Sequence, residues 1–91
     1  MFTLTGFQRD LLYVIAGLER PSGQTIKGHL EEDSGMDINH GRLYPNLDTL
    51  VDKQLVRKGE IDRRTNYYEI TSRGEWELRS RREWEDEYVE L

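Results

Sequence analysis

The sequence predicts a mostly helical α+β domain with three helices, a two-stranded hairpin and a final helix. Apolar residues recur at helical spacing in four segments of the chain. Two runs rich in β-branched and aromatic residues flank a polar turn at residues 62–66. The length of 91 residues fits one domain, and the absence of cysteine excludes disulfides, zinc–thiolate sites and thiol nucleophiles.

Capping residues delimit the first two helices. Thr5 and Gln8 have the spacing of a capping box, and apolar residues then recur with helical periodicity, so the first helix is expected over residues 6–19. A turn with proline follows, and Ser22 in this turn can cap the next helix. The second helix is expected over residues 24–33, with two aliphatic side chains facing inward.

The third helix follows a glycine C-cap at Gly35 and starts after Asn39, which is a suitable N-cap. Its predicted buried stripe consists of Leu43, Leu47, Leu50, Val51 and Gln54. Its opposite side carries Arg42, Asn46, Thr49 and Lys53. Pro45 removes one backbone hydrogen bond and is expected to bend the first turn.

The hairpin and the final helix complete the chain. The two strands are predicted at residues 55–61 and 67–70. Thr71 can cap a last helix that runs from Ser72 to about Glu90. The other faces of this helix are almost wholly charged, but one stripe is largely aromatic and apolar and consists of Trp76, Ser80, Trp84, Tyr88 and Leu91.

The order of three helices, hairpin and helix is that of a winged helix-turn-helix, whose third helix enters the major groove of DNA. Arg42 and Asn46 suit guanine and adenine edges respectively, through paired hydrogen bonds. The alternative is that both residues merely solvate an amphipathic helix. The hairpin tip can lie along a phosphate backbone or reach into a minor groove, although an arginine pair in a turn is a weak signal by itself.

The net charge of −5 argues at first against DNA binding, because phosphate contacts come from lysine and arginine. The charges are unevenly distributed, however. Residues 39–74 contain seven bases and five acids, a local charge of +2, so the remainder carries −7. Screening limits the reach of distant charges to about 8 Å at physiological salt, so a relatively basic face can dock on a polyanion. The alternative is a solvated acidic surface.

Several segments carry a family resemblance: Gly41-Arg42-Leu43-Tyr44-Pro45-Asn46-Leu47-Asp48-Thr49-Leu50, Leu55-Val56, Asp62-Arg63-Arg64-Thr65-Asn66-Tyr67-Tyr68, Ile70-Thr71 and Gly74. Over residues 4–74 the sequence resembles the PadR family of transcriptional regulators, in the short type with a single C-terminal helix. The resemblance places Pro45 inside the third helix and implies that Tyr44 contacts the DNA backbone or braces that helix. Gln54 stands where the family usually has glycine, which leaves the end of the third helix open.

The resemblance implies a sequence-specific regulator that binds double-stranded DNA as a homodimer and acts as a repressor. The predicted DNA-binding residues are Asn39, His40, Arg42, Tyr44, Asn46, Thr49, Lys53, Arg63, Arg64, Thr65 and Asn66. Two tryptophans and a tyrosine form an apolar surface that one small domain covers only in part, so a dimer interface is expected there. Its predicted residues are Phe2, Leu4, Trp76, Trp84, Tyr88 and Leu91, with the alternative that Trp76 packs within its own subunit.

Residues 1–71 are expected to form the DNA-binding part and residues 72–91 the dimerisation helix of the same single domain. The chain lacks a secretion signal and a long apolar stretch, so a cytoplasmic location and no membrane partner are expected. No catalytic residue, cofactor or metal site is predicted, because the two histidines lack a diagnostic spacing and no phosphate-binding loop is present.

Two further functions remain open at this stage. The first is a protein-interaction module, since winged helices also mediate contacts within assemblies and a net charge of −5 suits that role. The second is an additional small aromatic effector bound between the tryptophans at the dimer interface, which the resemblance implies for some short members of the family.

Overall fold

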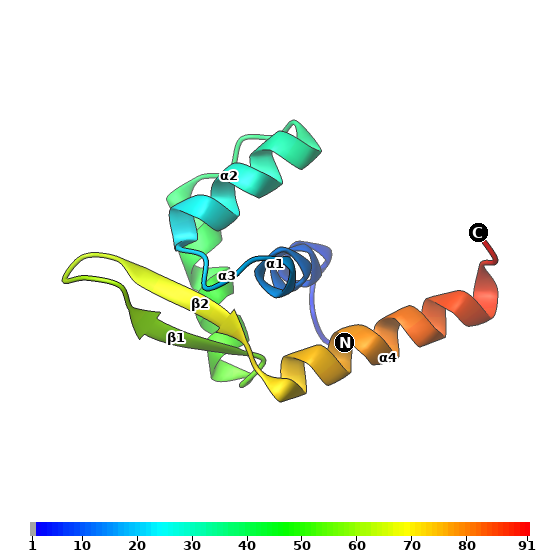
Figure 1. The fold of residues 1–91 in the computed structure, drawn as a ribbon. Helices are drawn as coiled ribbons and strands as arrows, with labels where there is room; N and C mark the ends of the chain where they lie inside the picture. Colours follow the sequence, from blue (N-terminus) through cyan, green and yellow to red (C-terminus); the bar gives the residue numbers. More distant parts are fainter. Residues whose placement is uncertain (1) are drawn as a thin grey trace.

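The computed structural model describes residues 2–91. These residues form the predicted order of elements: α1 (Gly6–Gly17), α2 (Gly23–Ser34), α3 (His40–Asp52), β1 (Val56–Glu60), β2 (Asn66–Ile70) and α4 (Ser72–Tyr88). The first three helices pack together, whereas the β1–β2 hairpin and α4 project in opposite directions from them (Figure 1). The hairpin and its connecting turn are called the wing below.

Local capping sets the helix boundaries, as the sequence predicts. Thr5 and Gln8 form a reciprocal capping box at the start of α1. The side chains of Ser22, Asn39 and Thr71 accept hydrogen bonds from the first turns of α2, α3 and α4. Two helices end about two residues earlier than expected, α1 at Gly17 and α4 at Tyr88.

Gly35 ends α2 in the left-handed conformation, with φ of 70°, as the glycine C-cap predicts. Pro45 lies inside α3, which continues through it to Asp52. The structure therefore agrees with the placement of this proline that the family resemblance implies.

One hydrophobic core joins the helices to the wing. Its most deeply buried side chains are Leu11, Leu12, Ile15, Ile26, Leu43, Leu47, Leu50, Val56 and Tyr68. Burial raises the pKa of Tyr68 to about 12, so its phenol stays neutral at ordinary pH. Leu4 is also part of this core and only 5% exposed, so its prediction as a dimer-interface residue is wrong. Its side chain is already covered within its own subunit.

The wing is an antiparallel pair in which Val56 lies opposite Ile70 and Glu60 opposite Asn66. It is tied to the loop between α1 and α2, because the backbone N–H of Tyr68 donates to the carbonyl of Pro21 at 2.8 Å. The sequence patterns did not predict this attachment. It fixes the direction in which the wing leaves the core.

The prediction that Gln54 is buried on α3 is wrong. The helical wheel placed it on the buried stripe of α3, but α3 ends at Asp52 and Gln54 is exposed in the left-handed region, with φ of 63°. A side chain with a Cβ atom is strained there. This strain gives a physical reason for the glycine that the family resemblance implies at this position.

We expect Gln54→Gly to stabilise the protein by about 0.5–1 kcal/mol, because glycine adopts positive φ without steric cost. The gain is smaller than the full strain, since glycine also adds entropy to the unfolded chain. Urea denaturation measures the difference. Lys53→Gly is the matched control: Lys53 has φ of −80°, so the same change there is expected to destabilise. Equal effects at both positions would contradict the explanation.

Candidate nucleic-acid interface

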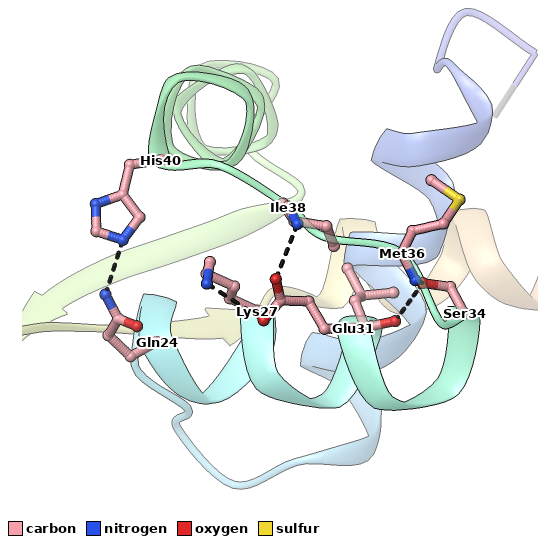
Figure 2. Close-up of polar contacts among 8 residues, drawn as sticks. Gln24, Lys27, Glu31, Ser34, Met36, Ile38 and His40 are labelled. Atoms are coloured by element: carbon pink, nitrogen blue, oxygen red, sulfur yellow. Dashed lines mark hydrogen bonds and ion pairs between the residues drawn. The ribbon is translucent and has the colours of Figure 1, made fainter.

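Polar contacts fix the connection between α2 and α3 (Figure 2). The carboxylate of Glu31 accepts the backbone N–H of Ile38 at 2.9 Å and pairs with the ammonium group of Lys27 at 3.2 Å. The Ile38 N–H, and secondarily Lys27, hold the pKa of Glu31 below its ordinary value. Closer to the start of both helices, Gln24 Nε2 lies 3.1 Å from His40 Nε2. These contacts set the position of α3 relative to α2.

The side chains of Arg42 and Asn46 lie against α1. The guanidinium carbon of Arg42 is 4.0 Å from the ring centroid of Phe7. Asn46 accepts a hydrogen bond from Gln8 Nε2 at 2.9 Å and donates one to the carbonyl of Arg42 at 2.7 Å. Arg42 is exposed, but Asn46 is half-buried. The side of α3 that was expected to face solvent therefore lies partly under α1.

The other two residues expected on that side differ in their exposure. Thr49 is half-buried and its hydroxyl donates to the carbonyl of Pro45 at 3.1 Å, whereas Lys53 is exposed. Other exposed positions of α3 include Gly41, Pro45, Asp48 and Asp52. These four were not assigned to the solvent-facing side from the sequence, although a wheel centred on the three buried leucines would have placed them opposite the core.

Tyr44 braces α3 against α2. A Cβ atom on Gly23, in the first turn of α2, would lie 2.7 Å from the Tyr44 ring, so ring and backbone are in close contact. The ring also meets His40 edge-on, with centroids 5.5 Å apart. Of the two roles that the resemblance implied for Tyr44, the structure therefore shows the bracing one.

The wing tip lies near Tyr44. A cavity of about 250 Å³ is lined by Tyr44, by the first residues of α2 and by the wing residues Arg64, Thr65 and Asn66. Arg63 and Arg64 are exposed. The carboxylate of Asp62 accepts the backbone N–H groups of Arg64 and Thr65, which closes the turn and lowers the pKa of Asp62. Residues far apart in sequence thus meet around one cavity.

Some basic side chains of residues 39–74 are already paired with carboxylates, so they are less available to bind an anion. Glu69 on β2 forms ion pairs with Arg57 and Arg20, and these two arginines, Arg57 first, lower the pKa of Glu69. Lys58 lies 3.8 Å from Asp48 of α3. The positive charge of this segment that is available for binding therefore lies at the wing tip, at Arg42 and Lys53, and at Arg73 in the first turn of α4.

We expect acid to destabilise the fold through Glu31, Asp62 and Glu69. Their pKa values lie below the ordinary 4.5 for glutamate and 3.8 for aspartate, so the unfolded chain binds protons first as the pH falls. The stabilisation is complete above about pH 5 and is lost as the pH falls through the lowered values. Thermal unfolding followed by circular dichroism between about pH 7 and pH 3 measures this. A melting temperature independent of pH there would contradict it.

A second surface lies on α4 and the N-terminal residues. We call it the aromatic face, and it consists of Phe2, Trp76, Trp84, Tyr88 and Leu91. The Trp84 ring lies 5.0 Å from that of Phe2 and 5.3 Å from that of Tyr88. Trp76 is 60% exposed, so the alternative that it packs wholly within its own subunit is wrong. The face stays uncovered by the described part of the chain.

The described residues were also considered as a metal site and as a membrane-spanning segment. Within residues 2–91, no group of three or more histidine, cysteine, aspartate or glutamate side chains is placed to hold a metal ion. No helix among the same residues is long and apolar enough to cross a membrane.

Comparison with known proteins shows what the chain resembles. The model of the transcriptional regulator PadR-like family matches residues 11–80. The structure of RosR from H. salinarum is 45% identical with a TM-score of 0.89, covering 98% of this chain and 82% of that one. A complex structure of RosR, hsRosR-SG, is 46% identical with a TM-score of 0.92, covering 99% of this chain and 80% of that one. No curated protein sequence matches the chain significantly.

Two structures of lower sequence identity show the fold alone. PadR of Bacillus subtilis, in complex with operator DNA, is 22% identical with a TM-score of 0.73. The similarity covers 96% of this chain and 50% of that one. F93 from STIV, described as a winged-helix DNA-binding protein, is 23% identical with a TM-score of 0.74 over 89% of this chain and 88% of that one.

Proposed function

The chain belongs to the PadR-like family of transcriptional regulators, and from this premise we propose that it represses transcription as a homodimer bound to an operator. As a member it is a DNA-binding regulator with a winged-helix fold. Membership in a family of transcriptional regulators and the B. subtilis PadR–operator complex, which has the same fold, support double-stranded DNA as the partner. They do not favour the alternative of an interaction module without specific DNA binding. The proposal includes no catalytic step.

The single observation that carries the site is the meeting of the wing tip with α3. Arg63 and Arg64 are exposed beside the cavity that Tyr44 lines, so one surface presents both α3 and the wing. Phosphate contacts position such a surface and base contacts specify the sequence. We assign base contacts to α3, led by Arg42, and backbone or minor-groove contacts to the wing.

The remaining predicted residues take supporting roles in this proposal. Asn39 and His40 lie at the N-terminus of α3, where backbone N–H groups and the helix dipole favour a phosphate. Lys53 is exposed at the other end and suits a phosphate as a point charge. Thr49, Thr65 and Asn66 are half-buried and reach DNA only at the edges of the surface.

The proposed dimer joins two copies through the aromatic face. A twofold axis would place two α3 helices about one helical turn of DNA apart, about 34 Å, and so match a pseudo-palindromic site. In this arrangement residues 1–71 carry the DNA contacts and residues 72–91 the dimer contact. Doubling the locally basic surface also offsets the net charge of −5 per chain.

The test is a fluorescence anisotropy titration against the promoter region of the protein's own gene, over a series of KCl concentrations. We expect specific binding whose affinity falls with salt, because phosphate contacts release counterions. Replacing Arg63 and Arg64 together by alanine is expected to weaken binding about tenfold or more and to lower the salt slope by about four, because the proposed dimer carries both arginines twice. Absence of specific, salt-sensitive binding by the unmodified protein would refute the proposed function.

The matched control removes the same charge elsewhere. Arg79 and Arg82 lie on α4 beside α1, away from the wing. Their joint replacement by alanine is expected to leave the salt slope unchanged, since neither contacts a phosphate in the proposed complex. A loss equal to that of the wing variant would mean that only total charge matters, and would contradict the assignment of the wing.

We also propose that the aromatic face can take a small aromatic ligand. A cavity of about 300 Å³ is lined by Phe2, Trp76, Glu77, Ser80, Arg81 and Trp84. Aromatic rings on its walls favour a flat aromatic molecule by stacking. Quenching of tryptophan fluorescence by a panel of aromatic compounds tests this, and no response across the panel would count against it.

A further inference from the structure

We propose that Gln8 of α1 is a positioning residue that orients Asn46 of α3 and thereby sets the base preference at one position of the operator. Gln8 lies outside the interface that the sequence predicts. The inference rests on the proposed function, in which α3 enters the major groove. It deepens that function by assigning sequence preference to a contact within the protein.

A chain of hydrogen bonds links the start of α1 to α3. The side-chain oxygen of Gln8 accepts the backbone N–H of Thr5 at 3.1 Å, and its nitrogen donates to Asn46 Oδ1 at 2.9 Å. The nitrogen of Asn46 then donates to the carbonyl of Arg42 at 2.7 Å. Gln8 is only 9% exposed, so water does not readily replace these partners.

The two ends of this chain dictate the orientation of both amides. The Thr5 N–H can only donate, so it requires the oxygen of Gln8. The Arg42 carbonyl can only accept, so it requires the nitrogen of Asn46. Reversing either amide would place two acceptors or two donors against each other and leave buried polar groups unpaired. The nitrogen of Gln8 therefore meets the oxygen of Asn46.

This orientation changes the role expected of Asn46. A paired contact with adenine uses the amide oxygen and an amide N–H together. Here the oxygen is engaged by Gln8, and one of the two N–H groups by Arg42. An amide oxygen has two lone pairs, so Asn46 keeps one N–H and one lone pair for a base edge, in directions that Gln8 and Arg42 fix. The neighbouring Phe7 holds the guanidinium of Arg42, so the first turn of α1 positions both side chains.

Gln8→Glu separates this role from the stability of α1. Glutamate is a usual partner in a capping box, so it keeps the acceptor for the Thr5 N–H. It cannot donate to Asn46, because an ionised carboxylate has no hydrogen to give. The added negative charge weakens binding to every DNA sequence alike. The informative quantity is therefore the ratio of dissociation constants between sequences at one salt concentration.

The experiment compares four full-length proteins: the unmodified chain, Gln8→Glu, Asn46→Ala and the double variant. Each is titrated with operator duplexes that carry each of the four base pairs at every position of a half-site. We expect Gln8→Glu to change the preference at one position by about three- to tenfold, at the same position that Asn46→Ala affects. In the Asn46→Ala background, the effect of Gln8→Glu on preference should disappear.

A second measurement needs no DNA. The side-chain amide resonances of Asn46, observed by NMR in the free protein, should shift in Gln8→Glu. Unchanged resonances would overturn the inference. So would a Gln8→Glu protein with unaltered preference, or one whose change persists without Asn46. If the unmodified protein binds all duplexes equally, the proposed function itself fails, and the inference falls with it.

Discussion

Gly74→Ala is expected to destabilise the protein by about 3 kcal/mol, at the upper part of the range for inserting a methyl group into a packed site. A Cβ atom on Gly74 would meet the backbone carbonyl of Leu55 and lie 2.6 Å from Ile70 Cγ1. The carbonyl cannot move aside, because it also accepts the backbone N–H of Thr71 at 3.0 Å. The first turn of α4 would have to lift away from the wing.

Thermal unfolding measures this effect, with an expected drop in melting temperature of more than about 10 °C. Gly28→Ala is the matched control. Gly28 lies within α2, and a Cβ atom there would meet nothing within 4 Å. Alanine is favoured over glycine inside a helix, so this variant should gain up to about 1 kcal/mol. A Gly74→Ala protein as stable as the unmodified one would contradict the close approach of α4 to the wing.

Trp76→Ala is expected to weaken the proposed dimer about a hundredfold and to reduce operator affinity at low protein concentration. Trp76 is 60% exposed within its own subunit, so its removal should leave the fold intact. Trp84 is less suitable for the test, because its ring packs on Phe2 and under the guanidinium of Arg81. Operator binding should recover as the protein concentration rises, because mass action restores the dimer.

Analytical ultracentrifugation and anisotropy measure the two effects on the same samples. Asp86→Ala is the control, since Asp86 lies on α4 in the groove beside Tyr13 of α1, away from the aromatic face. It should change neither the dimer nor the affinity. A Trp76→Ala protein that stays dimeric at the concentrations where the unmodified protein does would contradict the proposed interface.

The effects expected of Gly74→Ala and Trp76→Ala both depend on α4. Gly74 lets this helix approach the wing, and the aromatic face further along it is where the second copy is proposed to bind. A defect at Gly74 should therefore reduce operator binding as well as stability. The wing and the aromatic face then both depend on the contact at Gly74, although the wing and α4 project in opposite directions (Figure 1).

Much of the fold could be predicted because it depends on local interactions. The helix starts after Thr5, Ser22, Asn39 and Thr71 were predicted from residues that hydrogen-bond only three positions along the chain. The left-handed cap at Gly35 is equally local. Helical periodicity gave the three buried leucines of α3 for the same reason, since spacing alone decides which side chains share a face.

Tertiary structure decided the properties that depend on neighbours distant in sequence. Leu4 and Trp76 both looked like interface residues, but only the packed chain shows that the first is covered and the second is not. Asn46 looked free on a helical wheel, yet Gln8, 38 positions away, engages its oxygen. Amino-acid type and spacing determined the helices, the wing and the family of this protein. Which side chains remain available for DNA or a second copy was decided by what packs beside them, because burial and hydrogen-bond partners are set in three dimensions.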